Sequence, residues 1–248
     1  MSTHYPNAPI TEAIIDLRVM PAEGADHALL KLSEDRFLID YPQQDEIFEA
    51  VGQMAVGPRG GSASVQQSPI GWKFTSGDQK RIVQSRVNGF TFSRLAPYER
   101  WASFRTEARR LWGVYFDKMN PQAVVRIAVR YINRIDLPGD SVDLREYFRT
   151  SPEIAPELPQ QLDGYFMQLR FACPDVSGHC LMNQTIVPPA RKHVVSVVLD
   201  IDLFRSQELP QHEEDIWTCF ESLHVEKNAI FEACITDTAR RLFSSCPF

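Results

Sequence analysis

The chain has 248 residues, of which 44% are hydrophobic and 23% are charged, and its formal net charge is −6. These values are typical of a globular protein with a sizeable core, and the negative charge argues against a general coat for nucleic acids. We find no apolar run long enough to cross a bilayer, no signal-peptide pattern and no framework spacing among the five cysteines. We therefore expect a cytoplasmic protein with reduced thiols and without a membrane segment.

The first predicted element is a strand over Ile10–Val19. Its residues alternate between an apolar face and a face that carries Glu12 and Asp16. This period of two is typical of a strand with one buried face. Pro21 ends the strand.

Helices, a loop and a meander are predicted next. Asp26 is a suitable N-cap for a helix over residues 28–37, and a second short helix is expected over residues 45–54. The glycine-rich segment 57–64 predicts a loop. Three strands separated by turn signals are then predicted over residues 70–75, 80–87 and 90–95. A long amphipathic helix follows over residues 97–119.

The second half of the chain repeats this order of elements. Both closing helices contain the pattern Trp-x-x-Phe, at Trp101/Phe104 and at Trp217/Phe220. Internal similarity of this kind indicates a duplication. In this half we predict a strand over residues 124–135 and a short helix over 144–148. Three strands over 165–173, 180–186 and 193–203 follow, and then a long helix over 211–236.

The predicted fold class is α+β, with two β-α-β-β-β-α repeats that share one curved antiparallel sheet backed by long helices. The repeats cover residues 1–120 and 121–248, which together form a single globular unit. A single undivided α+β sandwich is the alternative.

The strand over residues 124–135 has an arginine at every fourth position. These arginines lie on the face opposite the apolar one, so they look away from the helices. If the opening strands of the two halves lie side by side, the carboxylates of the first face the arginines of the second. The predicted ligand-binding residues of this face are Glu12, Asp16, Arg86, Arg126, Arg130 and Arg134.

Two interpretations of this polar face stay open. Gln84, Asp200 and Asp202 are expected on the same face. In the first interpretation the face is a solvated surface crossed by ion pairs, and in the second it is a concave surface that binds a ligand or a partner. Arginines suit phosphates and carboxylates because the guanidinium group binds both with two hydrogen bonds.

His224 is a further candidate ligand-binding residue. It shares one face of the predicted closing helix with Asn228 and Phe231. The histidine orients a ligand in one interpretation and is a hydrogen-bonded interhelical residue in the other. Cys173, His179 and Cys180 lack the paired spacing of a zinc site, and no phosphate-loop or nucleophile-elbow motif occurs. No metal, cofactor or catalytic residue is predicted.

Four segments of the chain resemble a sporadically distributed family of uncharacterised bacterial and archaeal proteins of similar length. They are NAPITEAIIDLRV, FSRLAPYERWASF, VRYINRIDLP and SLHVEKNAIFEACITD, and they occur in this order across nearly the whole chain. The resemblance implies a bacterial cytoplasmic protein and implies no activity. The order of elements is also similar to the TATA-binding-protein fold, a saddle with helices on its convex side. A DNA-binding saddle requires basic and wedge-like aromatic residues, whereas acids are mixed into this one.

These observations predict a non-catalytic ligand-binding or partner-binding (adaptor) module that uses the polar face. Its expected partner is a protein or a small anionic ligand, with a homodimer as a further option. One alternative is a nucleic-acid-binding protein, because residues 80–134 contain 12 Lys/Arg and 3 Asp/Glu, a local balance of +9. The other alternative is an enzyme that acts on a small anionic substrate.

Overall fold

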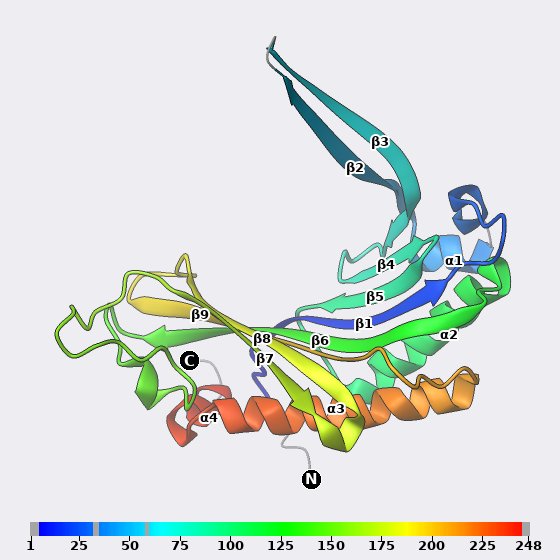
Figure 1. Ribbon diagram of the computed structural model, residues 1–248. Helices are drawn as coiled ribbons and strands as arrows, with labels where there is room; N and C mark the ends of the chain where they lie inside the picture. Colours follow the sequence, from blue (N-terminus) through cyan, green and yellow to red (C-terminus); the bar gives the residue numbers. More distant parts are fainter. Residues whose placement is uncertain (1–4, 32–34, 58–59, 245–248) are drawn as a thin grey trace.

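The computed structural model describes residues 5–31, 35–57 and 60–244. Within these residues, nine strands form one open sheet in the order β2-β3-β4-β5-β1-β6-β9-β8-β7 (Figure 1). The strands are β1 (Ile10–Met20), β2 (Gln43–Gly57), β3 (Gly60–Thr75), β4 (Arg81–Arg86), β5 (Gly89–Leu95), β6 (Ala123–Pro138), β7 (Phe166–Cys173), β8 (Gly178–Val187) and β9 (Val194–Arg205). The helices are α1 (Asp35–Asp40), α2 (Trp101–Met119), α3 (Glu213–Cys234) and α4 (Asp237–Ser244). The fold is therefore a mixed α+β fold with an antiparallel sheet.

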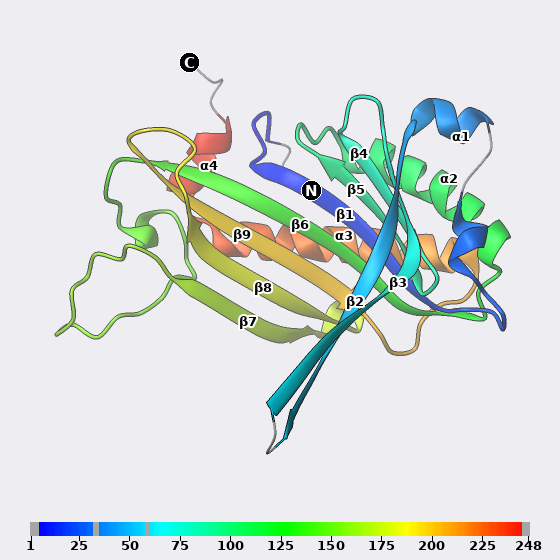
Figure 2. The same cartoon turned by 90° about the horizontal axis from the view of Figure 1, so that it is seen from above.

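The two opening strands, β1 and β6, pair at the centre of the sheet, as expected. Their antiparallel register sets Ile14 against Arg130 and Asp16 against Ala128, and Figure 2 shows them side by side. From this centre the order runs outward through β5, β4 and β3 on one side and through β9, β8 and β7 on the other. Strand β2 has no counterpart, and the duplication itself stays a prediction.

The long helices α2 and α3 cover one face of the sheet (Figure 1). Ile15 and Tyr131 of the central strands are fully buried, as are Trp112 of α2 and Phe220 of α3. Each large apolar side chain buried in this way contributes about 1.5–3 kcal/mol. The apolar alternation in the sequence thus fixes which face of the sheet meets the helices.

A bulge changes the predicted face of one residue in β6. The register shifts between Arg18 and Val19 of β1, opposite Arg126 and Val124. Regular alternation from Ile127 and Val129 would place Val125 in the core, but Val125 is 40% exposed and Val124 is buried instead. The extra residue of a bulge is pushed out of the alternation.

The predicted helix over residues 45–54 and most of the predicted loop over 57–64 are wrong, because both segments belong to a long hairpin of β2 and β3. Their register pairs Gln43 with Thr75 and Gly57 with Gly60. Residues 58 and 59 lie outside the described residues. Phe48 and Val51 have strong strand propensity, whereas the neighbouring acidic residues favoured the helix prediction.

The helix predicted over residues 28–37 is also shorter than expected. Asp26 is the N-cap, and its Oδ1 accepts a hydrogen bond of 3.1 Å from the Ala28 nitrogen. The capped element is a 3₁₀ turn over His27–Leu30, and α1 follows. The segment 32–34 between them lies outside the described residues.

Candidate binding face of the sheet

The helices leave one face of the sheet uncovered (Figure 2). The strand register places polar residues of β1, β4, β6 and β9 on this face. Strand side chains alternate, so every second residue of these strands reaches this face. It brings together nearly all of the predicted residues with Asp200 and Asp202, and we call it the polar sheet face. Its members are Glu12, Asp16, Gln84, Arg86, Arg126, Arg130, Arg134, Asp200 and Asp202.

Asp16 occupies the middle of the polar sheet face and holds two arginines from different strands. Its Oδ1 accepts a hydrogen bond of 2.9 Å from Arg126 Nη1, and its Oδ2 lies 3.3 Å from Arg86 Nη2. Thr91 Oγ1 donates to the same Oδ2 at 2.7 Å. Arg86 also donates to Gln84 Oε1 at 2.9 Å. Burial lowers the pKa of Arg86, and Asp16 opposes this shift.

Arg126 bridges the two halves of the sheet. Besides Asp16, it contacts Asp202 of β9, where Nη2 lies 3.0 and 2.8 Å from the two carboxylate oxygens. Its guanidinium carbon is 4.7 Å from the ring centroid of Phe204. Burial raises the pKa of Asp202, and the nearby Arg126 and Arg130 oppose that rise. The bridge stabilises the centre of the sheet at the cost of desolvating its charges.

Arg130 forms the most exposed part of the network. Its Nε and Nη2 donate to the two oxygens of Asp200 at 2.8 and 2.6 Å. The arginine side chain is 44% exposed, whereas the Asp200 side chain is 8% exposed. The hydrogen bond to Asp200 raises the pKa of Arg130. The guanidinium is thus fixed from below by a buried carboxylate and open to solvent above.

Arg134 and Glu12 complete the set of predicted residues on this face. Arg134 donates to the Pro188 carbonyl oxygen at 2.7 Å and to Ser196 Oγ at 3.1 Å, and its Nε lies 3.3 Å from Asp136. Within the described residues Glu12 has no ion pair, but its charge helps to raise the pKa of Arg130. All four arginines of the polar sheet face are therefore held by carboxylates of the same sheet.

His224, in contrast, lies on the other side of the sheet. Its ring stacks on Trp101 with centroids 4.2 Å apart, and its Nε2 is 3.1 Å from Asn228 Nδ2. Its Nδ1 is 3.5 Å from the Tyr131 hydroxyl. Burial lowers the pKa of His224 to about 3, with a smaller effect from Lys227. The histidine thus belongs to the packing between the helices and the sheet, and does not share the polar sheet face.

Lys227 is the charged residue of this interior that the sequence interpretation missed. It is 5% exposed, and its Nζ lies 3.6 Å from the centroid of the Tyr131 ring and 2.5 Å from Asn228 Oδ1. Burial lowers its pKa to about 7, which Glu232 partly opposes. The signal was present in the sequence, because Lys227 falls on the apolar stripe of α3 between Leu223 and Ile230.

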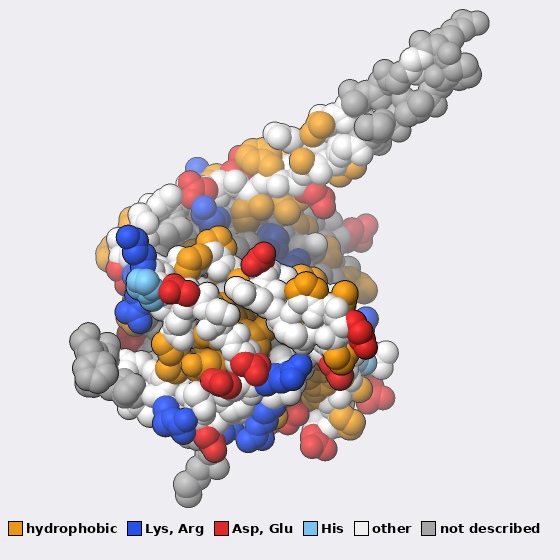
Figure 3. Space-filling model, turned by 90° about the vertical axis from the view of Figure 1, so that its left-hand side faces the viewer, with side chains coloured by type: hydrophobic (Ala, Val, Ile, Leu, Met, Phe, Trp, Pro, Cys, Tyr) orange, Lys and Arg blue, Asp and Glu red, His pale blue; other side chains and the backbone are white. Residues whose placement is uncertain are grey.

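The basic residues of segment 80–134 do not form one basic surface. They divide among the polar sheet face, helix α2 and the strands β4 and β5, and carboxylates from other segments neutralise most of them. Figure 3 shows basic and acidic side chains interspersed on the surface it displays. The arginines of this segment in ion pairs are Arg81, Arg86, Arg94, Arg105, Arg109, Arg110, Arg126, Arg130 and Arg134.

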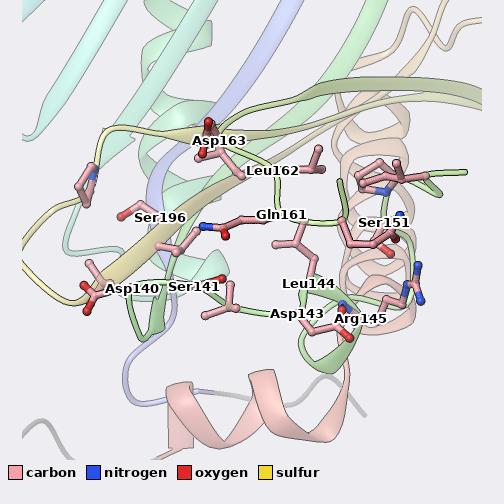
Figure 4. A pocket seen from close by; sticks show the side chains of 18 of the residues that line it. Asp140, Ser141, Asp143, Leu144, Arg145, Ser151, Gln161, Leu162, Asp163 and Ser196 are labelled. Carbon is pink, nitrogen blue, oxygen red and sulfur yellow. The ribbon is translucent and has the colours of Figure 1, made fainter. Parts of the chain in front are cut away.

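A cavity of about 690 Å³ lies beside the outer end of the polar sheet face (Figure 4). Its size is in the range of small-molecule pockets. Ser196, which accepts the hydrogen bond from Arg134, is part of its wall. The charged residues of the lining are Asp140, Asp143, Asp163 and Arg145, so the cavity does not suit an anion.

In comparisons with protein families and with curated proteins, no match to this chain was found. The family resemblance of the four sequence segments therefore stays a prediction. None of the helices within residues 5–31, 35–57 and 60–244 combines the length and apolar character needed to cross a membrane.

Thiol and metal chemistry find little support in the described part of the chain. Four cysteines, Cys173, Cys180, Cys219 and Cys234, are buried and free. Burial raises the pKa of Cys180 to about 12, which keeps its thiol protonated and unreactive. Among the described residues no group of three or more His, Cys, Asp or Glu could hold a metal ion. Cys246 lies outside these residues.

Proposed function

We propose that this protein is a non-catalytic binding module whose polar sheet face receives a partner protein. The observation that carries the proposal is the position of Arg130, which Asp200 fixes from below while 44% of its side chain stays exposed. A guanidinium held in this way has lost its conformational freedom before binding, so less entropy is lost when a partner docks. Such charges contribute specificity and association rate more than affinity.

A small anion is a less suitable ligand for this face. Arg126 and Arg130 already bind Asp202 and Asp200 with two hydrogen bonds each. An anion that took over these contacts would leave a buried carboxylate without its counter-ion, which costs about 3–5 kcal/mol. The same pairing occupies the oxygen atoms of both carboxylates, which does not suit general acid catalysis. A protein surface can instead contact the exposed edges of the network without breaking it.

We also infer that the two halves are structural repeats. The support is the strand order, in which β1, β5, β4 and β3 on one side correspond to β6, β9, β8 and β7 on the other. The Asp16–Arg126 ion pair then joins the two repeats at their common centre. The partner-binding face would lie across this junction.

The test is affinity capture from an extract of the source organism with a neutral double variant, Arg130→Gln with Asp200→Asn. Asp200→Asn is isosteric, and Arg130→Gln shortens the half-exposed side chain but keeps a polar amide that can hydrogen-bond, so we expect a melting temperature close to that of the wild type. We expect partner capture, measured by quantitative mass spectrometry, to fall at least tenfold. The matched control is Arg109→Gln with Glu213→Gln, which neutralises an ion pair between α2 and α3. Equal capture by all three proteins would contradict the proposal.

The same proteins test the nucleic-acid alternative by gel shift with mixed DNA and RNA at low salt. We expect no retention, because most arginines of segment 80–134 are paired. Retention that decreases steeply with salt concentration would favour nucleic-acid binding over the adaptor function.

A further inference from the structure

The hairpin of β2 and β3 extends far beyond the body of the protein (Figure 1). Strand β3 pairs with β4 only over residues 71–75, whereas its pairing with β2 continues to Gly60. Residues 48–57 and 60–69 therefore form a ribbon of two strands without a third strand beside them. We call this ribbon the β2–β3 arm.

The register gives the arm one apolar face near the body. Directly paired residues share a face, and Phe48 pairs with Pro69, Ala50 with Gln67 and Gly52 with Val65. Phe48 is 52% exposed and Val65 is 70% exposed. The opposite face carries the pairs Glu49–Ser68 and Val51–Gln66. The apolar face is thus open to solvent on a ribbon that has no core of its own.

The outer edge of the arm has few of the features that protect an exposed strand: the register of β2 and β3 shifts once, between Ile47 and Phe48 at the base of the arm, and is regular from Phe48 to Gly57. Edge strands of monomeric proteins usually carry lysine, proline or a bulge that prevents pairing with another chain. Residues 50–57 and 60–72 contain no charged residue, and β2 contains neither lysine nor proline. In addition, a ribbon of only two strands is marginally stable in water, whereas three or more strands with an apolar face are stable.

We propose that the β2–β3 arm is a dimerisation element that pairs with the arm of a second copy of this chain. Antiparallel pairing of the two β2 edges about a twofold axis makes a ribbon of four strands, and it is a closed contact between identical surfaces. Residues 48–57 and 60–69 of the arm contain no lysine or arginine, so the arm does not suit nucleic acid or anionic lipid, since both bind through these residues.

The charge pattern of β2 selects the antiparallel arrangement. Asp45, Glu46 and Glu49 lie toward the body, and the rest of the strand is uncharged. In an antiparallel pair the acidic base of one arm lies beside the neutral outer part of the other. A parallel pair would place the acidic residues of both copies together, and like charges opposite each other are destabilising.

The size of the arm sets the expected strength of the dimer. Ten residues of strand span about 33 Å, so a contact between two arms buries less than the ~800 Å² per partner of a standard stable interface. We therefore expect a weak dimer, with a dissociation constant roughly in the micromolar range.

Sedimentation velocity at protein concentrations from about 1 to about 200 μM tests the proposal. We expect the wild type to change from monomer to dimer and Val65→Lys to associate at least tenfold more weakly. The control is Val225→Lys, which changes a valine of α3 that is 65% exposed and should dimerise like the wild type. A wild type that stays monomeric at all concentrations would overturn the proposal; this result is expected if the arm binds a different protein. Undiminished dimerisation of Val65→Lys would overturn it as well.

Single cysteine substitutions at each position from 48 to 57, the β2 side of the arm, locate the contact. Near a twofold axis a residue lies opposite its own copy, so oxidation should produce a covalent dimer at one or two neighbouring positions and at none of the others. The wild type gives the background from its own cysteines. A dimer that no arm position cross-links would place the interface elsewhere and exclude the arm.

Discussion

At the scale of single residues, the most unusual feature is the pair of basic side chains between the sheet and α3. Lys227 and His224 are both held in an apolar layer with Tyr131 beside them, and the charge of Glu232 partly opposes the pKa shift of Lys227. Burial lowers the pKa of Lys227 to about 7 and that of His224 to about 3. Both shifts mean that the folded protein favours the neutral forms, so each residue makes stability depend on pH in its own range.

Lys227→Met should stabilise the protein and flatten its pH dependence between pH 7 and pH 9. In this range the unfolded chain holds a proton on Lys227, with a pKa of 10.5, whereas the folded chain releases it near pH 7. The wild type therefore gains up to about 1.4 kcal/mol of unfolding free energy per pH unit as pH rises. Below pH 7 Lys227 is protonated in both the folded and the unfolded chain, so the destabilisation caused by burying its charge no longer changes with pH.

Urea unfolding at pH 7, 8 and 9 measures this effect. Removal of the buried charge should raise the unfolding free energy at pH 7 by about 1–4 kcal/mol. Between pH 3 and pH 6.5, where His224 titrates, the unfolding free energy of the variant should still rise with pH. If wild type and variant showed equal slopes above pH 7, Lys227 would be charged and compensated in the folded state.

At the scale of elements, the sequence predicted regular strands better than it predicted the long hairpin. The alternation of β1 and β6 was clear because one face of each is buried and the other is polar. The β2–β3 arm has no such contrast, since both of its faces meet solvent. Its acidic residues and glycines therefore resembled a helix and a loop. The pattern of a sequence records burial, and an element without a core leaves a weak pattern.

Gly71 marks the point where β3 leaves the body, and Gly71→Ala should destabilise the protein. An added Cβ would lie 2.1 Å from the Ser85 carbonyl oxygen and 2.8 Å from the Arg86 Cα. Both are backbone atoms, so the strands must separate, at a cost of about 1–3 kcal/mol. The control is Gly52→Ala in the same hairpin, where the added Cβ meets nothing within 4 Å.

Thermal unfolding at low protein concentration measures both glycine variants without dimerisation. We expect a lower melting temperature for Gly71→Ala and an unchanged or slightly higher one for Gly52→Ala. Equal melting temperatures would mean that β3 and β4 separate without cost at this position.

At the scale of the whole molecule, the sequence identified the faces of the sheet but not the partners across it. The positions of Asp16 and Arg126 on the polar side followed from the period of two. That Asp200 binds Arg130 and Asp202 binds Arg126 depends on the order β1-β6-β9, which local patterns do not determine. Ion pairing across strands therefore became visible only with the topology.

The central position of β1 and β6 leads to a last prediction, that the two halves of the chain unfold together. Each half uses the other to cover the edge of its opening strand, and Trp101 of the first half packs on His224 of the second. We expect tryptophan fluorescence and far-ultraviolet circular dichroism to report one coincident urea transition for the full chain. Residues 121–248 expressed alone would expose the edge of β6 and the apolar side of α3. This fragment should therefore aggregate or lack a cooperative transition, and a fragment that folds cooperatively would show two independent domains.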